Sequence, residues 1–300
     1  MEKDKLLTIG RNGEMIEVFD LEDPTRQCSL RLNVSMKVDT IGLLNDSNPI
    51  FCHLDTTENH QCVAYTMIND EIEELHMTIG TLGSDVGYTT SVVFNGLLWL
   101  SGGYDYQNDV FIKQTQTLES GTLVNTLGIP TKLYQHCLVP LDDSILVIGG
   151  SDMENQDQDL ILNQDNFFVK PDLKSISSAP KSLMPRYGHA CARLNNSVFV
   201  VGGKTKNGLT DTMEVLDLST MIWSFGPSLL TLISEDIDLV AFEDSLVLLS
   251  GNADDGQPSF YKYTCTYGFC EWTVFEGYKV GAYYGALHAL MIPSNFTNCD

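Results

Sequence analysis

Long hydrophobic runs are missing from this sequence of 300 residues. Its apolar runs are only about five to seven residues long, whereas a membrane-spanning helix needs roughly 18. The first ten residues, "MEKDKLLTIG", also lack the apolar core of a secretory signal. The sequence as it stands therefore predicts neither a membrane helix nor a signal peptide.

Basic residues are scarce, with 17 Lys and Arg against 40 Asp and Glu, so the formal net charge is −23. No Lys/Arg cluster stands out from this acidic background, and binding to a phosphate backbone depends on such clusters. We therefore expect no nucleic-acid partner and no binding to anionic membranes.

Patterns typical of metal or catalytic sites are missing too. The six histidines show no HxxxH spacing and the cysteines no CxxC spacing, which leaves no support for a metal set or a Ser-His-Asp array. The run "SDMENQDQDLILNQD" (151–165) has carboxylates for calcium but lacks the glycine of an EF-hand loop, so we expect a solvated acidic loop. We expect no metal, no cofactor and no catalytic residue.

What the sequence does contain is a repeat. The apolar runs "LLWLSGG", "ILVIGG" and "VFVVGG" each end in two glycines, and "LLTIG", "IFCH" and "LVLLSG" hold corresponding places. Their spacing is roughly 50 residues, the length of one four-stranded propeller blade.

The best-formed repeat is "RYGHACARLNNSVFVVGGKTKNGLTDTMEVLDLSTMIW" (186–223). It predicts four short strands with tight turns, the second ending at Gly202. The double glycine, Glu214 with Asp217 on the third strand, and Trp223 after the next turn make this stretch resemble the kelch repeat. The repeats around Gly102 and Gly149 lack that Trp, and the first two lack the glycine pair.

The fold class implied is all-β, a six-bladed kelch-type β-propeller. The chain opens on a second strand, and "YYGALHALMI" (283–292) repeats the first-strand pattern, so the C-terminal strand should pair beside the N-terminal strand and close the ring. The expected blades are 1–33 with 281–293, 38–80, 86–128, 133–181, 186–229 and 235–279. This ring uses all 300 residues, so we expect no BTB or BACK adaptor domain among them.

Several residues are predicted to be structural. The glycine pairs should end the second strands of their repeats where neighbouring blades crowd near the axis, because no Cβ fits there and glycine adopts the required backbone angles. His136 and His189 occupy the same place in successive first strands, which indicates repeat-consensus residues. The predicted structural residues are Gly102, Gly103, Gly149, Gly150, Gly202, Gly203, Trp223 and Trp272.

The cysteines give information on the cellular compartment of the protein, because disulfides form mainly outside the cytoplasm. Cys265 and Cys270 should face each other on a hairpin, as should Cys52 and Cys62, and Cys28 and Cys299 could join the ends of the ring. Cys137 and Cys191, both in first strands, are predicted to be buried free thiols. Disulfides favour secretion, as do the sequons at Asn33, Asn45, Asn195 and Asn295, whereas reduced thiols would fit a cytoplasmic protein. The last blade resembles secreted invertebrate kelch proteins.

The resemblance also implies a binding face. Kelch domains that bind peptides use the loops after the double glycine and those before each first strand. The positions in this sequence are Tyr88, Tyr104, Tyr134, Asp152, Arg186, Tyr187, Glu235, Asp254, Tyr283 and Tyr284. These residues predict a non-catalytic interaction module whose partner is basic or polar-aromatic.

Two other functions stay open. Sialate mutarotases are similar in architecture, so the alternative is a carbohydrate-active or glycan-binding propeller with acidic groups at the channel mouth. Actin cross-linking fits less well, because the acidic surface of actin would repel this chain.

Overall fold

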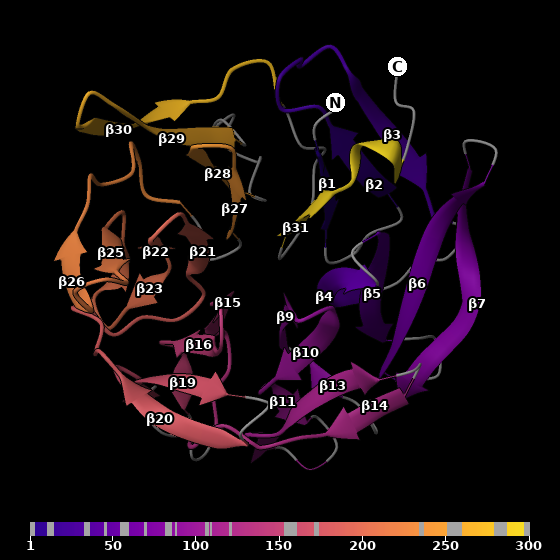
Figure 1. The fold of residues 1–300 in the computed structure, drawn as a ribbon, viewed down its shortest axis with the longest axis horizontal. Coiled ribbons are helices and arrows are strands. Elements are labelled where there is room, and N and C mark those ends of the chain that lie inside the picture. Colours follow the sequence, from indigo (N-terminus) through magenta and orange to yellow (C-terminus); the bar gives the residue numbers. More distant parts are fainter. Residues whose placement is uncertain are drawn as a thin grey trace.

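The structure is a computed structural model, and it forms a ring of sheets around a central axis (Figure 1). It describes residues 4–10, 15–32, 37–44, 47–54, 60–68, 71–81, 86–87, 89–105, 108, 110–119, 122–152, 161–170, 174–233, 237–250, 260–278 and 287–296. Within these ranges six sheets have four antiparallel strands each, and we number them as blades 1 to 6 along the chain.

The strands of each blade are named from the innermost to the outermost. Blade 1 contains β31 (Leu287–Ile292), β1 (Lys5–Gly10), β2 (Met15–Phe19) and β3 (Gln27–Arg31). Blade 2 contains β4 (Lys37–Leu44), β5 (Asn48–Leu54), β6 (His60–Ile68) and β7 (Glu71–Thr81). Blade 3 contains β9 (Thr90–Phe94), β10 (Leu97–Ser101), β13 (Thr115–Glu119) and β14 (Thr122–Asn125).

The second half of the ring repeats this order. Blade 4 contains β15 (Cys137–Pro140), β16 (Ile145–Ile148), β19 (Asn166–Lys170) and β20 (Ser175–Ala179). Blade 5 contains β21 (Ala190–Leu194), β22 (Ser197–Val201), β25 (Met213–Asp217) and β26 (Ile222–Phe225). Blade 6 contains β27 (Ile237–Phe242), β28 (Ser245–Ser250), β29 (Phe260–Thr266) and β30 (Phe269–Val274), and the short helix η1 (Ser294–Phe296) follows blade 1's β31.

The two ends of the chain close the ring. Strand β31 pairs antiparallel with β1 from Lys5 opposite Ile292 to Gly10 opposite Leu287. The two strands lie side by side in Figure 1, at the meeting of the first and last colours of the chain. The predicted six-bladed propeller and its closure by the C-terminal strand are therefore confirmed.

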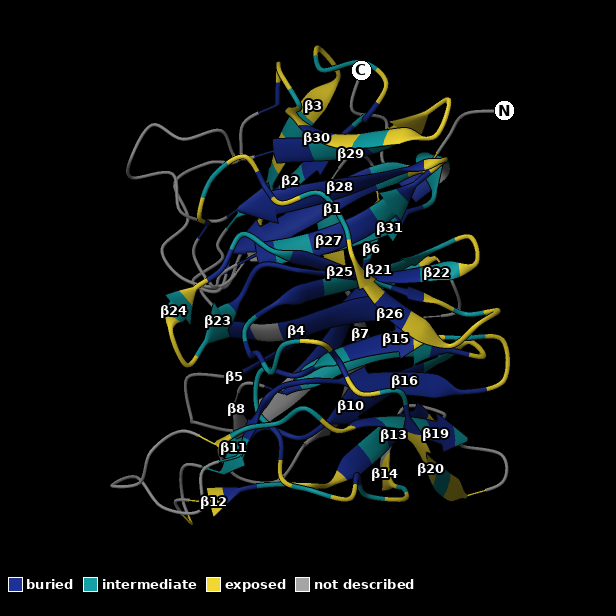
Figure 2. Cartoon of the chain, turned by 90° about the vertical axis from the view of Figure 1, so that its left-hand side faces the viewer, coloured by how far each residue is buried: buried dark blue, intermediate teal, exposed yellow. Residues whose placement is uncertain are grey.

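Burial explains why the second strands are continuous apolar runs. Every residue of β16 and of β28 is buried, because both faces of an inner strand are covered by neighbouring blades. The outermost strands reach solvent: in β26 only Trp223 is buried (Figure 2). Aromatic pairs such as Phe19 with Phe260 and Phe199 with Tyr263 bridge adjacent blades, with ring centroids 5.1 and 5.6 Å apart.

The glycine pairs lie where two blades meet. A Cβ on Gly149 would be 2.7 Å from the His189 ring and 2.8 Å from the Arg186 carbonyl oxygen of blade 5, and one on Gly150 would be 2.7 Å from the His136 Cβ of its own blade. Real Cβ atoms do not approach so closely, so the Gly149–Gly150 pair fits between His136 of its own blade and His189 of the next. Positive φ angles occur at all six predicted positions, Gly102, Gly103, Gly149, Gly150, Gly202 and Gly203.

The two predicted structural tryptophans are buried. Trp223 is 7% exposed and donates its indole N–H to the Pro180 carbonyl oxygen at 3.0 Å, which links blade 5 to the chain leaving blade 4. Trp272 is 3% exposed and packs on Tyr263.

The disulfides differ from the prediction in one place. Cys52–Cys62 and Cys265–Cys270 are bonded between directly opposed residues of one sheet, as predicted. Cys137 and Cys191, predicted to be free thiols, instead form a disulfide between the first strands of blades 4 and 5. Cys28 is disulfide-bonded, but the predicted partner Cys299 lies outside the described residues.

Helices contribute little to this fold. No helix in the described ranges is long and apolar enough to cross a membrane.

Candidate interaction face

Short hairpins follow the glycine pairs and build one face of the propeller, which we call the double-glycine face. In blade 3 the strands β11 (Tyr104–Asp105) and β12 (Val110–Phe111) pair, and β8 (Val86–Gly87) joins them. Blade 4 adds β17 (Ser151–Asp152) with β18 (Ile161–Leu162), and blade 5 adds β23 (Lys204–Thr205) with β24 (Gly208–Leu209).

Four aromatic side chains form a continuous row across three blades on this face. The ring centroids are 4.9 Å apart for Tyr104 and Phe111, 5.4 Å for Phe111 and Tyr134, and 6.0 Å for Tyr134 and Tyr187. The row ends at Lys204, whose ammonium nitrogen is 6.0 Å from the centroid of Tyr187. We call these five residues the aromatic strip.

Backbone hydrogen bonds hold the strip in place. Tyr134 and Ser151 exchange two N–H···O bonds of 3.1 Å, and Tyr187 exchanges two with Lys204, of 3.1 and 2.9 Å. Tyr104 is opposite Phe111 in the β11–β12 ladder. Each ring is therefore tied to the hairpin that follows a glycine pair, and the repeat geometry sets the spacing along the strip.

Exposure divides the strip into two kinds of residue. Phe111 and Tyr187 are 9% and 8% exposed, so they are mainly packing residues. Tyr104 and Tyr134 are only partly buried, which leaves part of each ring open to solvent. A partner that reaches this face would therefore meet Tyr104 and Tyr134.

Arg186 does not belong to the binding rim where it was predicted. Its side chain is 1% exposed and forms an ion pair of 2.6 Å with Glu214, which is fully buried. Its guanidinium also donates to the Gly202 and Thr212 carbonyl oxygens, at 2.8 and 3.1 Å. Burial lowers the pKa of Arg186 from its ordinary value, and Glu214 opposes that effect. The residue thus fixes the loop before β21, and a partner cannot reach it.

Of the predicted acidic residues, Asp152 lies on this face and accepts a hydrogen bond of 3.0 Å from the Thr131 hydroxyl. The neighbouring Asp105 accepts bonds of 3.0 and 2.8 Å from the backbone and side chain of Asn108. The remaining predicted binding residues, Tyr88, Glu235, Asp254, Tyr283 and Tyr284, lie outside the described residues.

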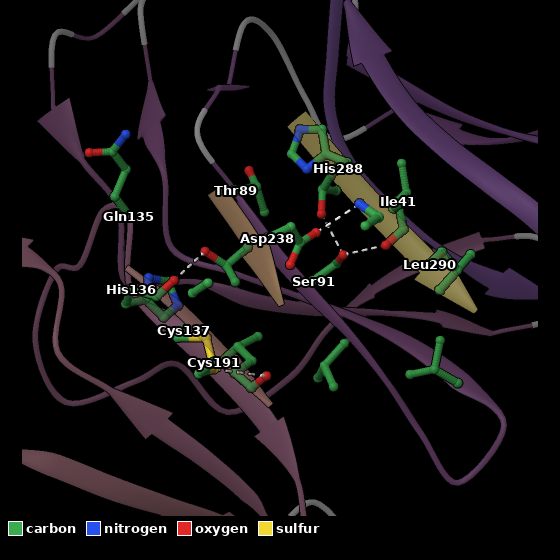
Figure 3. A pocket seen from close by; sticks show the side chains of 18 of the residues that line it. Ile41, Thr89, Ser91, Gln135, His136, Cys137, Cys191, Asp238, His288 and Leu290 are labelled. Atoms are coloured by element: carbon green, nitrogen blue, oxygen red, sulfur yellow. Dashed lines mark hydrogen bonds between the residues drawn. A yellow bond between two sulfur atoms is a disulfide. The ribbon is translucent and has the colours of Figure 1, made fainter. Parts of the chain in front are cut away.

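A cavity of about 430 Å³ lies along the axis and is lined by the first strands of all six blades (Figure 3). Residues of neighbouring blades are joined across its wall. The Thr40 hydroxyl donates to Ser91, whose hydroxyl donates to the Ile41 carbonyl oxygen at 2.6 Å. Asp238 accepts the backbone N–H of Ala289 at 2.8 Å, and the Cys137–Cys191 disulfide joins blades 4 and 5.

Burial strongly shifts the pKa values of three groups in this wall. It lowers the pKa of His136 to about 3, and that of His189 to about 3 with a smaller effect of nearby Arg186. It raises the pKa of Asp238 to about 6, although hydrogen bonds from Ala289 and Leu239 act in the other direction. At neutral pH these histidines are uncharged and the Asp238 carboxyl group is mostly ionised. Within the described ranges no three His, Cys, Asp or Glu residues are grouped to hold a metal.

Sequence reasoning missed Phe111 and Asp238. Phe111 follows a glycine pair by eight positions, in a segment without the strand-length apolar pattern that predicts a hairpin. Asp238 is the first polar residue of the apolar strand "IDLVAF". A lone acidic residue inside an apolar strand was the feature of the sequence that could have indicated a buried carboxyl group.

Comparisons with known proteins agree with this architecture. The Kelch motif profile matches residues 185–230, which is blade 5 with its flanking loops. Two F-box/kelch-repeat proteins of Arabidopsis thaliana are similar, one 27% identical over 106 residues and the other 36% over 93. These alignments cover 35% and 31% of this chain. Kelch-like protein 40 of Xenopus tropicalis is 26% identical over 206 residues, or 65% of this chain.

These matches cover only part of the relatives, 38%, 24% and 30% of their lengths in the same order. Among solved structures, that of YjhT superposes with a TM-score of 0.69 over 89% of this chain and 94% of its own, at 11% identity, and so shows the same fold. The motif match coincides with blade 5 and the other sheets repeat its strand order around one axis, so this chain contains a kelch repeat and has the architecture of a kelch-type β-propeller.

Proposed function

We propose that this propeller is a non-catalytic protein-interaction module that binds a peptide or protein through the double-glycine face, with the aromatic strip at the centre. The observation that carries the proposal is the row of rings from three blades, spaced 4.9 to 6.0 Å apart and fixed by the backbone. Rigid aromatic side chains supply large contact area at a small cost in conformational entropy, which is why they concentrate binding energy at interfaces.

Charge narrows the class of partner. The chain carries a formal net charge of −23, and Asp105 and Asp152 lie beside the strip. A negative surface steers basic partners toward it and repels acidic ones. The partner proposed is therefore basic or polar-aromatic, and its binding should weaken as salt screens the charges.

Glycoside hydrolysis, one form of the carbohydrate-active alternative, has less support. Glycoside hydrolysis uses two carboxyl groups that flank the bond to be cut. The cavity wall in the described ranges contributes one, that of Asp238.

A selection experiment tests the proposal without requiring that the partner be identified first. A phage-displayed library of random peptides is selected on the wild-type protein, and the enriched peptides are synthesised and titrated by fluorescence anisotropy. We expect basic and aromatic residues to be enriched. Affinity should fall at least about tenfold in Tyr134→Ala and in Tyr104→Ala, since removal of a central aromatic contact costs on the order of 2 kcal/mol.

Tyr267→Ala is the matched control. This tyrosine is fully exposed in the β29–β30 turn, so its loss should leave both peptide affinity and melting temperature unchanged. The melting temperatures of Tyr104→Ala and Tyr134→Ala show whether a loss of binding is merely a loss of folding. The proposal is wrong if peptides bind the two strip variants and the wild type equally.

A further inference from the structure

The polar side chains that line the channel cavity are concentrated toward one end, where Val38 and Ile237 line it as well. Thr89, Gln135 and His136 line it at the start of first strands, next to the glycine pairs, whereas Leu43, Val93 and Leu290 line it further along. The starts of the first strands lie at the double-glycine face, because Tyr134 bonds to Ser151 directly after Gly150. The polar half of the cavity therefore belongs to the face that carries the aromatic strip.

Several polar atoms in this half are buried without a hydrogen-bond partner among the described residues. They are the Thr89 hydroxyl, the Gln135 side-chain oxygen and both ring nitrogens of His136. Thr89 and His136 are 5% and 4% exposed. Buried polar atoms in proteins are nearly always paired with protein, water or ligand. A neutral histidine offers one acceptor nitrogen, so this wall carries three acceptor groups that nothing from the described chain satisfies.

Asp238 adds a negative charge to the same cavity. Its two carboxylate oxygens accept the N–H groups of Leu239 and Ala289, each at 2.8 Å, and each oxygen keeps a further lone pair for another donor. The titratable side chains in the described lining around it are His136, His189 and His288. His136 and His189 are uncharged at neutral pH because burial lowers each pKa to about 3. Figure 3 shows Asp238, His136 and Thr89 on the cavity wall, with Gln135 on the same wall but pointing away from Asp238.

We propose that the polar half of the channel binds an ammonium or guanidinium group, which pairs with the Asp238 carboxylate. Such a group supplies both the missing positive charge and the missing donors, and the cavity of about 430 Å³ has the size of a small-ligand site. Tyr134 of the strip directly precedes Gln135 and His136 in the sequence. The cation is thus the side chain of a Lys or Arg on the partner. This source of the cation rests on the proposed function, whereas the cation site itself does not.

Small cations test the site directly. n-Butylammonium and methylguanidinium are titrated against the protein by ligand-observed NMR at pH 7, with tetramethylammonium as the control that has the charge but no N–H donor. We expect saturable binding of the first two and none of the third. In Asp238→Asn their affinity should fall at least about tenfold, the usual scale for loss of a charge-assisted hydrogen bond. Asp142→Asn, which removes an exposed carboxyl group at the β15–β16 turn, should bind as the wild type does.

A pH titration of the wild type keeps the test valid if Asp238→Asn fails to fold. Only the ionised carboxylate attracts the cation, and the pKa of Asp238 is about 6. Affinity should therefore fall about tenfold or less from pH 7 to pH 5, as the ionised fraction decreases. Equal binding to Asp238→Asn, equal binding of tetramethylammonium, or no saturable binding would each overturn the proposal and leave a channel filled with water.

The source of the cation is tested with the selected peptides. Each Lys of a peptide is replaced by norleucine, and the affinities for wild type and Asp238→Asn are compared. If replacing a Lys lowers the affinity for the wild type but not for Asp238→Asn, that Lys of the partner occupies the cation site. If peptides need Tyr134 but neither Asp238 nor their own Lys, the proposed function stands and the partner source is wrong. If the small cations need Asp238 but peptides do not need the strip, the site stands and the proposed function fails.

Discussion

Glu214 and Asp217, the two acidic residues of the third strand of blade 5, stabilise different parts of the fold. Glu214 is fully buried and accepts the backbone N–H groups of Leu183 and Met184, at 2.6 and 3.1 Å, besides its ion pair with Arg186. Asp217 is exposed and accepts the N–H groups of Ser219 and Thr220 in the following turn, at 2.7 and 3.0 Å. One acid therefore fixes the loop before the blade, and the other fixes a turn within it.

Replacement of Glu214 by Ala should be among the most destabilising single changes in blade 5. It leaves a buried guanidinium and two backbone N–H groups without their acceptor, which typically costs about 3 to 5 kcal/mol. Asp142→Ala is the control, because Asp142 pairs with Arg193 at the surface, where its side chain is 89% exposed. Such an exposed pair contributes little to stability, because water and salt screen it. Urea unfolding measures the stability of both variants. Similar unfolding midpoints for Glu214→Ala and Asp142→Ala would contradict the structural role given to Glu214.

At the scale of strands, in-sheet neighbours were predictable and neighbours across blades were not. Cys52 and Cys62 face each other in one ladder, as do Cys265 and Cys270, so turn length and strand period are enough to pair them. In the ladders Cys137 is opposite Ile148 and Cys191 opposite Val200, in two different sheets. Their disulfide depends on how blades 4 and 5 are rotated against each other, which local sequence does not encode.

Removal of the Cys137–Cys191 disulfide should cost more stability than removal of Cys265–Cys270. The first closes a sequence separation of 54 residues and the second one of 5. In the chain-entropy account these loops correspond to about 4 and about 2 kcal/mol. Paired Cys→Ala variants, unfolded in urea without reductant, measure the difference.

Alkylation with iodoacetamide, followed by mass spectrometry, tests whether the Cys137–Cys191 disulfide is present. Labelling of Cys137 and Cys191 in the unreduced wild type, unfolded in the presence of the reagent, would show free thiols and contradict the bond between blades 4 and 5.

For the whole molecule, the fold was far easier to predict than the site. The second strands of the blades are buried on both faces, so their apolar runs and glycine ends recur along the sequence and reveal the number of blades. The aromatic strip arises from three hairpins that meet only in the folded ring, and Arg186 has the sequence position of a rim residue although it is buried. Periodicity locates strands, whereas the exposure of a loop side chain depends on the neighbouring blade.

Closure of the ring by β31 leads to the last prediction. A chain that ends before Leu287 lacks the innermost strand of blade 1, so the edge of β1 loses six paired residues and Asp238 loses the Ala289 N–H. An open edge invites aggregation. At roughly 2 to 4 °C per kcal/mol for a chain of this size, a loss of several kcal/mol should lower the melting temperature by about 10 °C or more.

A circular permutant with residues 281–300 moved in front of residue 1 is the matched control, since it keeps every residue and supplies the same strand to β1 from the N-terminal end of the chain. It should melt within a few degrees of the wild type and remain monomeric in size-exclusion chromatography. A truncated chain as stable as the wild type would mean that the β1–β31 pairing contributes little, and that the contacts between blades alone hold the ring closed.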